Sequence, residues 1–182
     1  TIERRIKRLL RRVFERFEGT AVEHAMGGGQ FDYERFRQEL RKVLGEQMRT
    51  VTVAQVLAIA AEVGVAFDPV NISTQAARWA RQYTDNLVNQ LMDTTRNGIG
   101  ELVAQYAENP EMSVRDLRDL LQNTHAFTPV RAERIAVTET TRAYSQATTE
   151  YRNLLEKQGL EMSRIWQTAA DDLVCFPAWT MV

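Results

Sequence analysis

Glu139 and Arg142 are the two residues whose types and spacing could form a specific polar site. They lie three residues apart in a Thr-rich stretch that we predict to be helical, so they share one helix face. A carboxylate and a guanidinium at this spacing form a charge-assisted hydrogen bond. Two interpretations stay open. One is a surface ion pair beside threonines that bond back to helix carbonyls, and the other is a buried pair that fixes the helix against a strand containing Trp166.

Asp171, Asp172 and Cys175 form a second group of polar side chains, near the end of the sequence. Carboxylates and a thiolate can bind zinc, which takes four ligands in structural sites. Cys175 is the only cysteine, however, and no histidine lies near it in the sequence. We therefore expect no metal at these residues and no cofactor in the protein.

The sequence carries none of the common catalytic motifs. It has no Gly-x-Ser-x-Gly turn, and Gly27-Gly28-Gly29 lacks both the preceding strand and the following Lys-Ser or Lys-Thr of a phosphate-binding loop. The carboxylates are scattered along predicted helices. We therefore predict a protein that is not an enzyme. The rival hypothesis, an enzyme that uses Glu139, requires a pocket around Glu139 and Arg142.

Basic residues cluster at the N-terminus, although the whole chain has a formal net charge of −1. Residues 1–20 hold seven basic groups against three acidic ones. Neutralising phosphates requires such clusters, so this segment could contact DNA or an acidic protein. The alternative is a solvated face opposite an apolar stripe. The basic residues concerned are Arg4, Arg5, Lys7, Arg8, Arg11 and Arg12.

Apolar residues at helical spacing predict that most of the chain is α-helix. A basic amphipathic helix at 1–26 is followed by a second that starts near Asp32, a suitable N-cap. Residues 53–60 mark a third, shorter helix. The longest apolar run, Val56–Ala61, is far shorter than the roughly 20 residues that span a bilayer, so we expect no contact with a membrane.

Start and stop signals place the remaining helices. Asn97-Gly98 would bend or split the longest of them, and Val130, Val137, Tyr144 and Tyr151 recur every seven residues as the apolar stripe of the last. The expected starts are Ser73, the capping-box pair Ser113 and Asp116, and Thr128-Pro129, and the expected ends are Pro110 and Gly159.

After Gly159 the apolar period changes from helical to two, which predicts a strand through Trp166, a turn at Asp171-Asp172 and a returning strand at 173–176. The predicted fold class is mainly α: an elongated helical domain with long amphipathic helices and a small C-terminal β-hairpin, which a truncated tail would leave incomplete. The predicted division is a basic helix at 1–26, a helical domain at 30–127, and a helix plus hairpin at 128–182.

Residues 128–175 resemble the head morphogenesis, or minor head protein, family of tailed bacteriophages, the Mu F-like group. The family pattern continues with Cys-Pro-x-Cys, which looks capable of holding a metal, whereas this chain reads Cys175-Phe-Pro-Ala and lacks the second cysteine. The resemblance implies a structural role for its residues. They are Arg134, Ile135, Thr138, Glu139, Arg142 and Tyr144 on the last helix, followed by Trp166, Asp171 and Cys175.

The resemblance implies a non-enzymatic phage minor head protein that binds the portal and other head proteins during capsid assembly. It would contact packaged DNA through the basic helix, and it would reside in the host bacterial cytoplasm during assembly and then in the virion head. The alternative hypothesis is a helical DNA-binding module that acts through the basic N-terminal helix. Self-association would follow if Trp166 and Trp179 were exposed.

Overall fold

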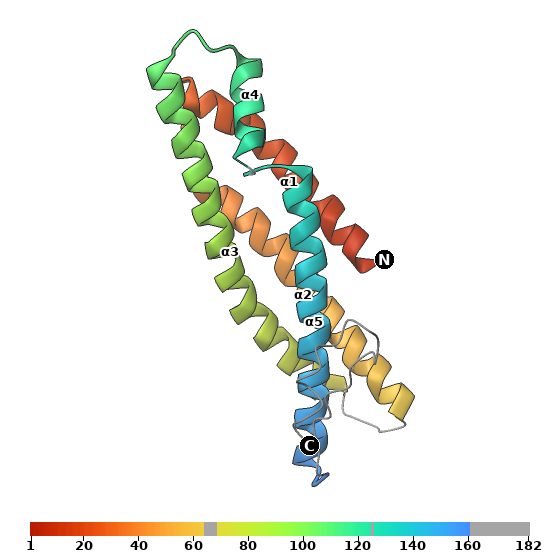
Figure 1. The fold of residues 1–182 in the computed structure, drawn as a ribbon. Helices are drawn as coiled ribbons and strands as arrows, with labels where there is room; N and C mark the ends of the chain where they lie inside the picture. The colour runs from red at the N-terminus through yellow and green to blue at the C-terminus, as the bar shows by residue number, and fades with distance from the viewer. Residues whose placement is uncertain (64–68, 125, 161–182) are drawn as a thin grey trace, which may run out of the picture. The chain divides into compact units, whose positions relative to one another are not determined.

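The computed structural model describes residues 1–63, 69–124 and 126–160, which form five α-helices (Figure 1). No strand occurs among these residues, so the prediction of a mainly α-helical protein is confirmed. The hairpin predicted after Gly159 lies outside the described residues. The helices are α1 (Ile2–Ala25), α2 (Tyr33–Val63), α3 (Pro69–Glu108), α4 (Val114–Asn123) and α5 (Pro129–Lys157).

The chain divides into two units, Thr1–Tyr151 and Arg152–Val182. In the second unit the described residues are the last turns of α5 and its C-terminal end. Gly159 has a φ of +86°, and the N–H of Leu160 donates to the carbonyl of Leu155 at 3.2 Å. Glycine adopts this left-handed conformation without steric cost, so Gly159 ends α5 as predicted.

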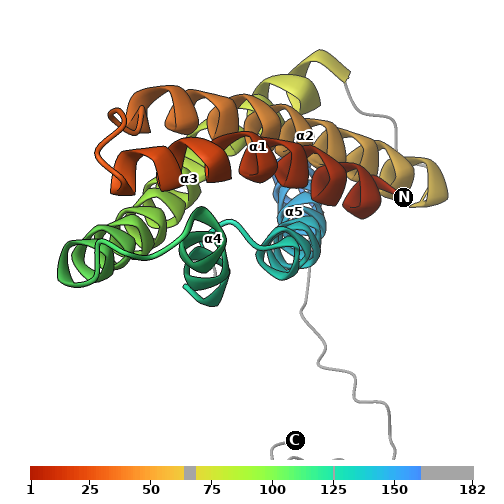
Figure 2. The same cartoon turned by 90° about the horizontal axis from the view of Figure 1, so that it is seen from above.

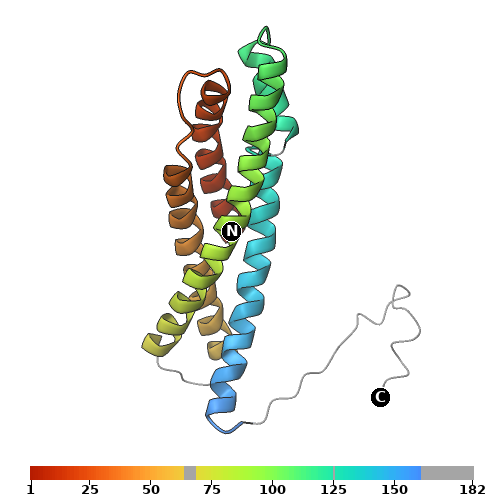
Figure 3. The ribbon, with the colours of Figure 1, turned by 90° about the vertical axis from the view of Figure 1, so that its left-hand side faces the viewer.

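In the first unit, α1 and α2 form an antiparallel pair that lies beside α3 and α5 (Figures 2 and 3). The short helix α4 lies between α3 and the start of α5 (Figures 1 and 2). None of the described helices is both long enough and apolar enough to cross a membrane.

An aromatic cluster lies in the core, to which all five helices contribute side chains. Its rings have centroids 5.0 to 6.3 Å apart and come from α1, α2 and the segments before α2 and α5. Burying a phenyl side chain contributes about 1.5–3 kcal/mol, so the cluster is a major source of stability. The phenylalanines are Phe14, Phe17, Phe31, Phe36 and Phe127.

The prediction of two helices between Asp32 and Gly64 is wrong, because α2 runs unbroken from Tyr33 to Val63. Its buried stripe continues through Met48, Val51 and Val56, and no Gly or Pro interrupts residues 46–63. The β-branched residues here lower helix propensity only slightly. Packing against α3 outweighs that cost.

The expected start of the long helix at Ser73 is also displaced, because α3 begins four residues earlier, at Pro69. Proline suits this position, since the first N–H groups of a helix have no intrahelical partner. Two other expected starts are confirmed. Ser113 and Asp116 form a reciprocal capping box at α4, and the Thr128 hydroxyl accepts from the Arg131 N–H at 3.1 Å at the start of α5. Hydrogen bonds from Ser113 lower the pKa of Asp116.

Gly98 does not split α3, which continues through it to Glu108. A Cβ at Gly98 would lie 2.8 Å from the Thr124 hydroxyl and 3.0 Å from the Ala126 Cβ. The Thr124 hydroxyl is held in place because it donates to the Leu121 carbonyl at 2.7 Å. The absence of a side chain at Gly98 therefore lets the segment between α4 and α5 pack directly on α3.

We expect Gly98→Ala to lower the free energy of unfolding and Gly100→Ala to raise it by about 0.5–1 kcal/mol. Both substitutions gain helix propensity, but a Cβ at Gly100 meets nothing within 4 Å, whereas one at Gly98 displaces the Thr124 segment. Urea unfolding of both variants measures the difference. Equal stabilisation by the two alanines would show that the close approach at Gly98 is absent.

Candidate functional site

The residues that resemble the family motif divide between the two faces of α5. Glu139 is 3% exposed and Ile135 is also buried, so both face the interior. The side chain of Arg142 is 54% exposed. The remaining described members of the motif, Arg134, Thr138 and Tyr144, are exposed. The members Trp166, Asp171 and Cys175 lie outside the described residues.

Glu139 and Arg142 form a polar cluster with Tyr83 of α3. The Tyr83 hydroxyl donates to one Glu139 carboxylate oxygen at 2.5 Å and accepts from the Arg142 guanidinium at 2.5 Å. Arg142 also donates to the other carboxylate oxygen at 3.3 Å. The indole of Trp79 stacks on the Tyr83 ring at 5.1 Å between centroids. Both carboxylate oxygens thus have partners within the protein, and the cluster joins α3 to α5.

Neither of the two interpretations of Glu139 and Arg142 describes the cluster fully. Glu139 is buried, as the second interpretation requires, but its partner is Tyr83. Arg142 is half exposed and forms the ion pair that the first interpretation requires. Thr141 also bonds back to the Val137 carbonyl, at 3.0 Å, as the first interpretation predicts.

The cluster favours a protonated phenol at Tyr83. Burial raises the pKa of Tyr83, and its hydrogen bond to Glu139 raises it further, although Arg142 acts in the opposite direction. The pKa of Arg142 is itself raised, first by its hydrogen bond to Tyr83 and then by the Glu139 carboxylate. At neutral pH the arrangement is a neutral phenol between two opposite charges, a geometry suited to holding two helices together.

Arg131, at the start of α5, has a structural role that the sequence did not reveal. Its guanidinium donates to the Leu91 carbonyl at 2.9 Å, to the Thr95 hydroxyl at 3.1 Å and to the Ala126 carbonyl. It also lies over the Phe14 ring, 5.5 Å from the centroid. Burial lowers its pKa to about 10, so the group stays charged at neutral pH.

Seven Lys and Arg side chains lie along α1, and three of them are paired. Lys7 contacts Glu133 of α5 at 2.8 Å, Arg11 contacts Glu15 at 3.4 Å, and Arg16 contacts Glu39 of α2 at 3.3 Å. Among the described residues, no ion pair involves the other four. The free cations of this α1 basic surface are Arg4, Arg5, Arg8 and Arg12. A shallow hollow of about 320 Å³ lies among the side chains of this surface.

Three apolar residues of α5 face away from the core. Val130 is 54% exposed, Val137 45% and Tyr144 40%. The prediction that the seven-residue repeat marks the buried face is wrong for these three, although Tyr151 is buried. The buried face instead consists largely of Ala132, Ala136, Ala143 and Ala147, together with Ile135. Alanines thus occupy most of the inner face of α5, and the larger repeat residues lie on its outer face. We call Val130, Val137 and Tyr144 the α5 outer row.

Comparison with protein-family models, with curated proteins and with solved structures finds no match to this chain. Within residues 1–63, 69–124 and 126–160, no three His, Cys, Asp or Glu side chains come together as a metal site would require. Function must therefore be argued from the cluster and the exposed surfaces.

We expect Tyr83→Phe to lower the free energy of unfolding by about 1–3 kcal/mol at neutral pH, because it removes a hydrogen-bond donor from a buried carboxylate. Tyr106→Phe is the matched control, since Tyr106 is half-buried and no hydrogen bond of its hydroxyl occurs among the described residues. Chemical denaturation of both variants measures the difference. Equal effects of the two substitutions would contradict the claim that the Tyr83 hydroxyl stabilises the contact between α3 and α5.

The same pair of variants tests the pH dependence. The pKa of Tyr83 is raised in the folded state, so its contribution is fully present below the unfolded pKa of about 10 and is lost as pH rises through the folded value. The wild type should lose more stability above pH 10 than Tyr83→Phe does. Tyr33, whose pKa is also raised, contributes equally to both proteins.

Proposed function

We propose that this chain is a minor head protein of a tailed phage that acts through protein contacts in capsid assembly and has no catalytic activity. The observation that carries the proposal is the two-sided character of α5. The inner face of this helix is fixed to α3 by the cluster at Glu139, and its outer face presents a row of exposed apolar side chains. The resemblance of residues 128–175 to the minor head protein family supplies the assembly context.

The α5 outer row has the spacing of a helix-docking surface. Its members recur every seven residues, or about 10 Å along the helix at 1.5 Å per residue. A partner helix can pack against such a row in the manner of a coiled coil, because residues seven apart return to nearly the same side of a helix. The partner that we propose is the portal or another head protein, met in the host cytoplasm before the protein enters the virion head.

A complex formed through this row should survive high salt, because apolar contacts are not screened by ions. The test is co-purification of the chain with the portal protein encoded beside it, followed by sizing at two salt concentrations. We expect the wild type to form a complex under both conditions and the double variant Val137→Lys, Tyr144→Lys to lose it.

Val103→Lys and Val114→Lys provide the matched control, since both valines are exposed on other helices. This control protein should keep the complex. Failure of the wild type to bind any head protein, or binding that the α5 variant leaves unchanged, would contradict the proposal.

A second candidate function is a helical DNA-binding module that uses the α1 basic surface. The free Arg4, Arg5, Arg8 and Arg12 favour it, because each can neutralise a backbone phosphate. Such binding weakens steeply with salt, which distinguishes it from docking through the α5 outer row.

A further inference from the structure

A hollow of about 370 Å³ lies between α2 and α3, and its described lining residues all come from these two helices. Its floor is made of the small residues Gly45, Ala77 and Ala80, and Gly45 sits opposite Thr84. Its walls are long side chains, chiefly Arg41, Lys42, Arg49 and Arg81. The small residues leave room between the helices, and basic side chains from both helices line the hollow.

The hollow continues along α3. A neighbouring hollow of about 540 Å³ shares Ala77 and Arg81 with the first and adds Arg78. We call the two together the α2–α3 basic groove. The cations that line it come from two helices, so packing of α2 on α3 creates a charged surface that neither helix has alone.

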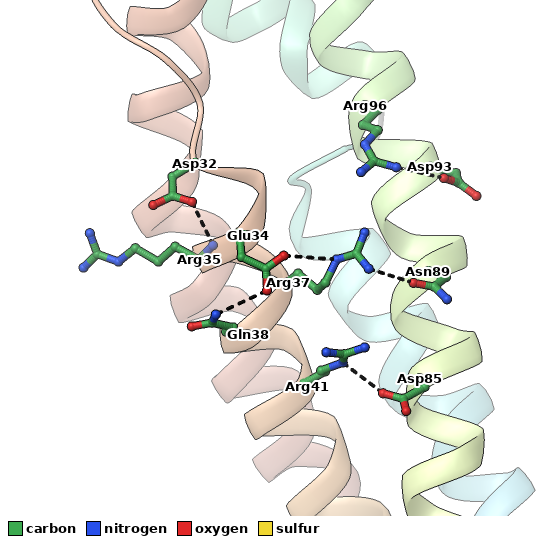
Figure 4. Close-up of polar contacts among 10 residues, drawn as sticks. All are labelled: Asp32, Glu34, Arg35, Arg37, Gln38, Arg41, Asp85, Asn89, Asp93 and Arg96. Atoms are coloured by element: carbon green, nitrogen blue, oxygen red, sulfur yellow. Dashed lines mark hydrogen bonds and ion pairs between the residues drawn. The ribbon is translucent and has the colours of Figure 1, made fainter.

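The balance of charge changes along the line where α2 packs on α3, which we call the α2–α3 seam. Towards the start of α2 its cations are compensated (Figure 4). Arg37 reaches Glu34 at 3.8 Å and Asn89 at 3.2 Å, and Arg41 contacts Asp85 at 2.9 Å. Arg96 on α3 similarly pairs with Asp93. This part of the seam is close to neutral.

The groove itself carries an excess of positive charge. Lys42, Arg49, Arg78 and Arg81 have no ion pair or side-chain hydrogen bond within the part of the chain that the structure describes. Glu46 is the carboxylate on its described walls, and Asp85 is already engaged by Arg41. A cluster of unpaired cations repels itself, and binding of an anion relieves that repulsion.

We propose that the α2–α3 basic groove binds the phosphate groups of a nucleic-acid backbone without reading the base sequence. This inference concerns a site distinct from the α1 basic surface and does not rest on the head-protein proposal. The guanidinium fork of arginine matches the geometry of phosphate oxygens, and three of the four unpaired cations are arginines.

The composition of the groove separates nucleic acid from an acidic protein partner. Protein partners bind mainly through large side chains buried in apolar pockets, and a floor of glycine and alanine offers no such pocket. Its described lining also contains no aromatic side chain on which a base could stack. The features of the groove that can bind a ligand are therefore its positively charged side chains, which suit the phosphates of a nucleic-acid backbone.

The test is binding of a fluorescent 30-base-pair DNA duplex to the full chain across a range of salt concentrations. We expect Arg49→Gln with Arg81→Gln to make the slope of log affinity against log salt shallower by up to about 1.8, since each phosphate contact contributes about 0.9. Arg115→Gln with Arg118→Gln on α4 removes the same charge from exposed positions and should leave the slope unchanged. Circular dichroism melts establish that both variants are folded.

Two further arms identify the source of any binding. Arg4→Gln with Arg8→Gln removes free cations from the α1 basic surface, and polyglutamate tests whether any polyanion displaces the duplex. We expect the groove variant to lose affinity and polyglutamate to compete poorly at equal charge.

Four results would overturn the proposal. Three are no duplex binding by the wild type, an identical slope in the groove and α4 variants, and displacement by polyglutamate at equal charge, which would indicate an acidic protein partner. The fourth is loss of binding in the α1 variant alone, which would support the second candidate function.

Discussion

The partly buried guanidinium of Arg131 is the interaction on which the arrangement of α1, α3 and α5 in the first unit depends. It connects the start of α5 to the Leu91 carbonyl and Thr95 hydroxyl of α3, to the Ala126 carbonyl, and to the Phe14 ring of α1. Removing an arginine from water is costly, and no carboxylate is among the partners that the structure describes for it. The three acceptors and the aromatic face offset that cost only if α1, α3 and α5 keep their relative positions.

A fixed start determines which face of α5 turns inward. Glu139, two turns beyond Arg131, then meets Tyr83, and the alanines pack against the neighbouring helices. The same rotation places the α5 outer row on the surface. Gly98 contributes to this arrangement because it admits the segment that carries Thr124 and Ala126 onto α3. The surfaces that we propose to bind partners are those that this packing leaves exposed.

The sequence predicted those features that depend on neighbouring residues. The capping box at Ser113, the start at Thr128 and the end at Gly159 are local chemistry, and all three are confirmed. Tyr83 could not be paired with Glu139 from one sequence, because 56 residues separate them. The role of Arg131 could not be predicted either, because its acceptors Thr95 and Leu91 lie 36 and 40 residues away in the sequence. The seven-residue repeat gave the wrong buried face for most of α5, because the spacing of large apolar residues does not show that a face of alanines packs inward.

The most direct test is amide hydrogen exchange of Arg131→Lys compared with the wild type. Lysine keeps the charge but lacks the planar fork that serves three acceptors at once. The account predicts that amides of residues 132–151 lose protection worth about 2 kcal/mol or more, while the central turns of α2 stay protected. Unchanged protection of α5 in Arg131→Lys would contradict the claim that this guanidinium positions the helix.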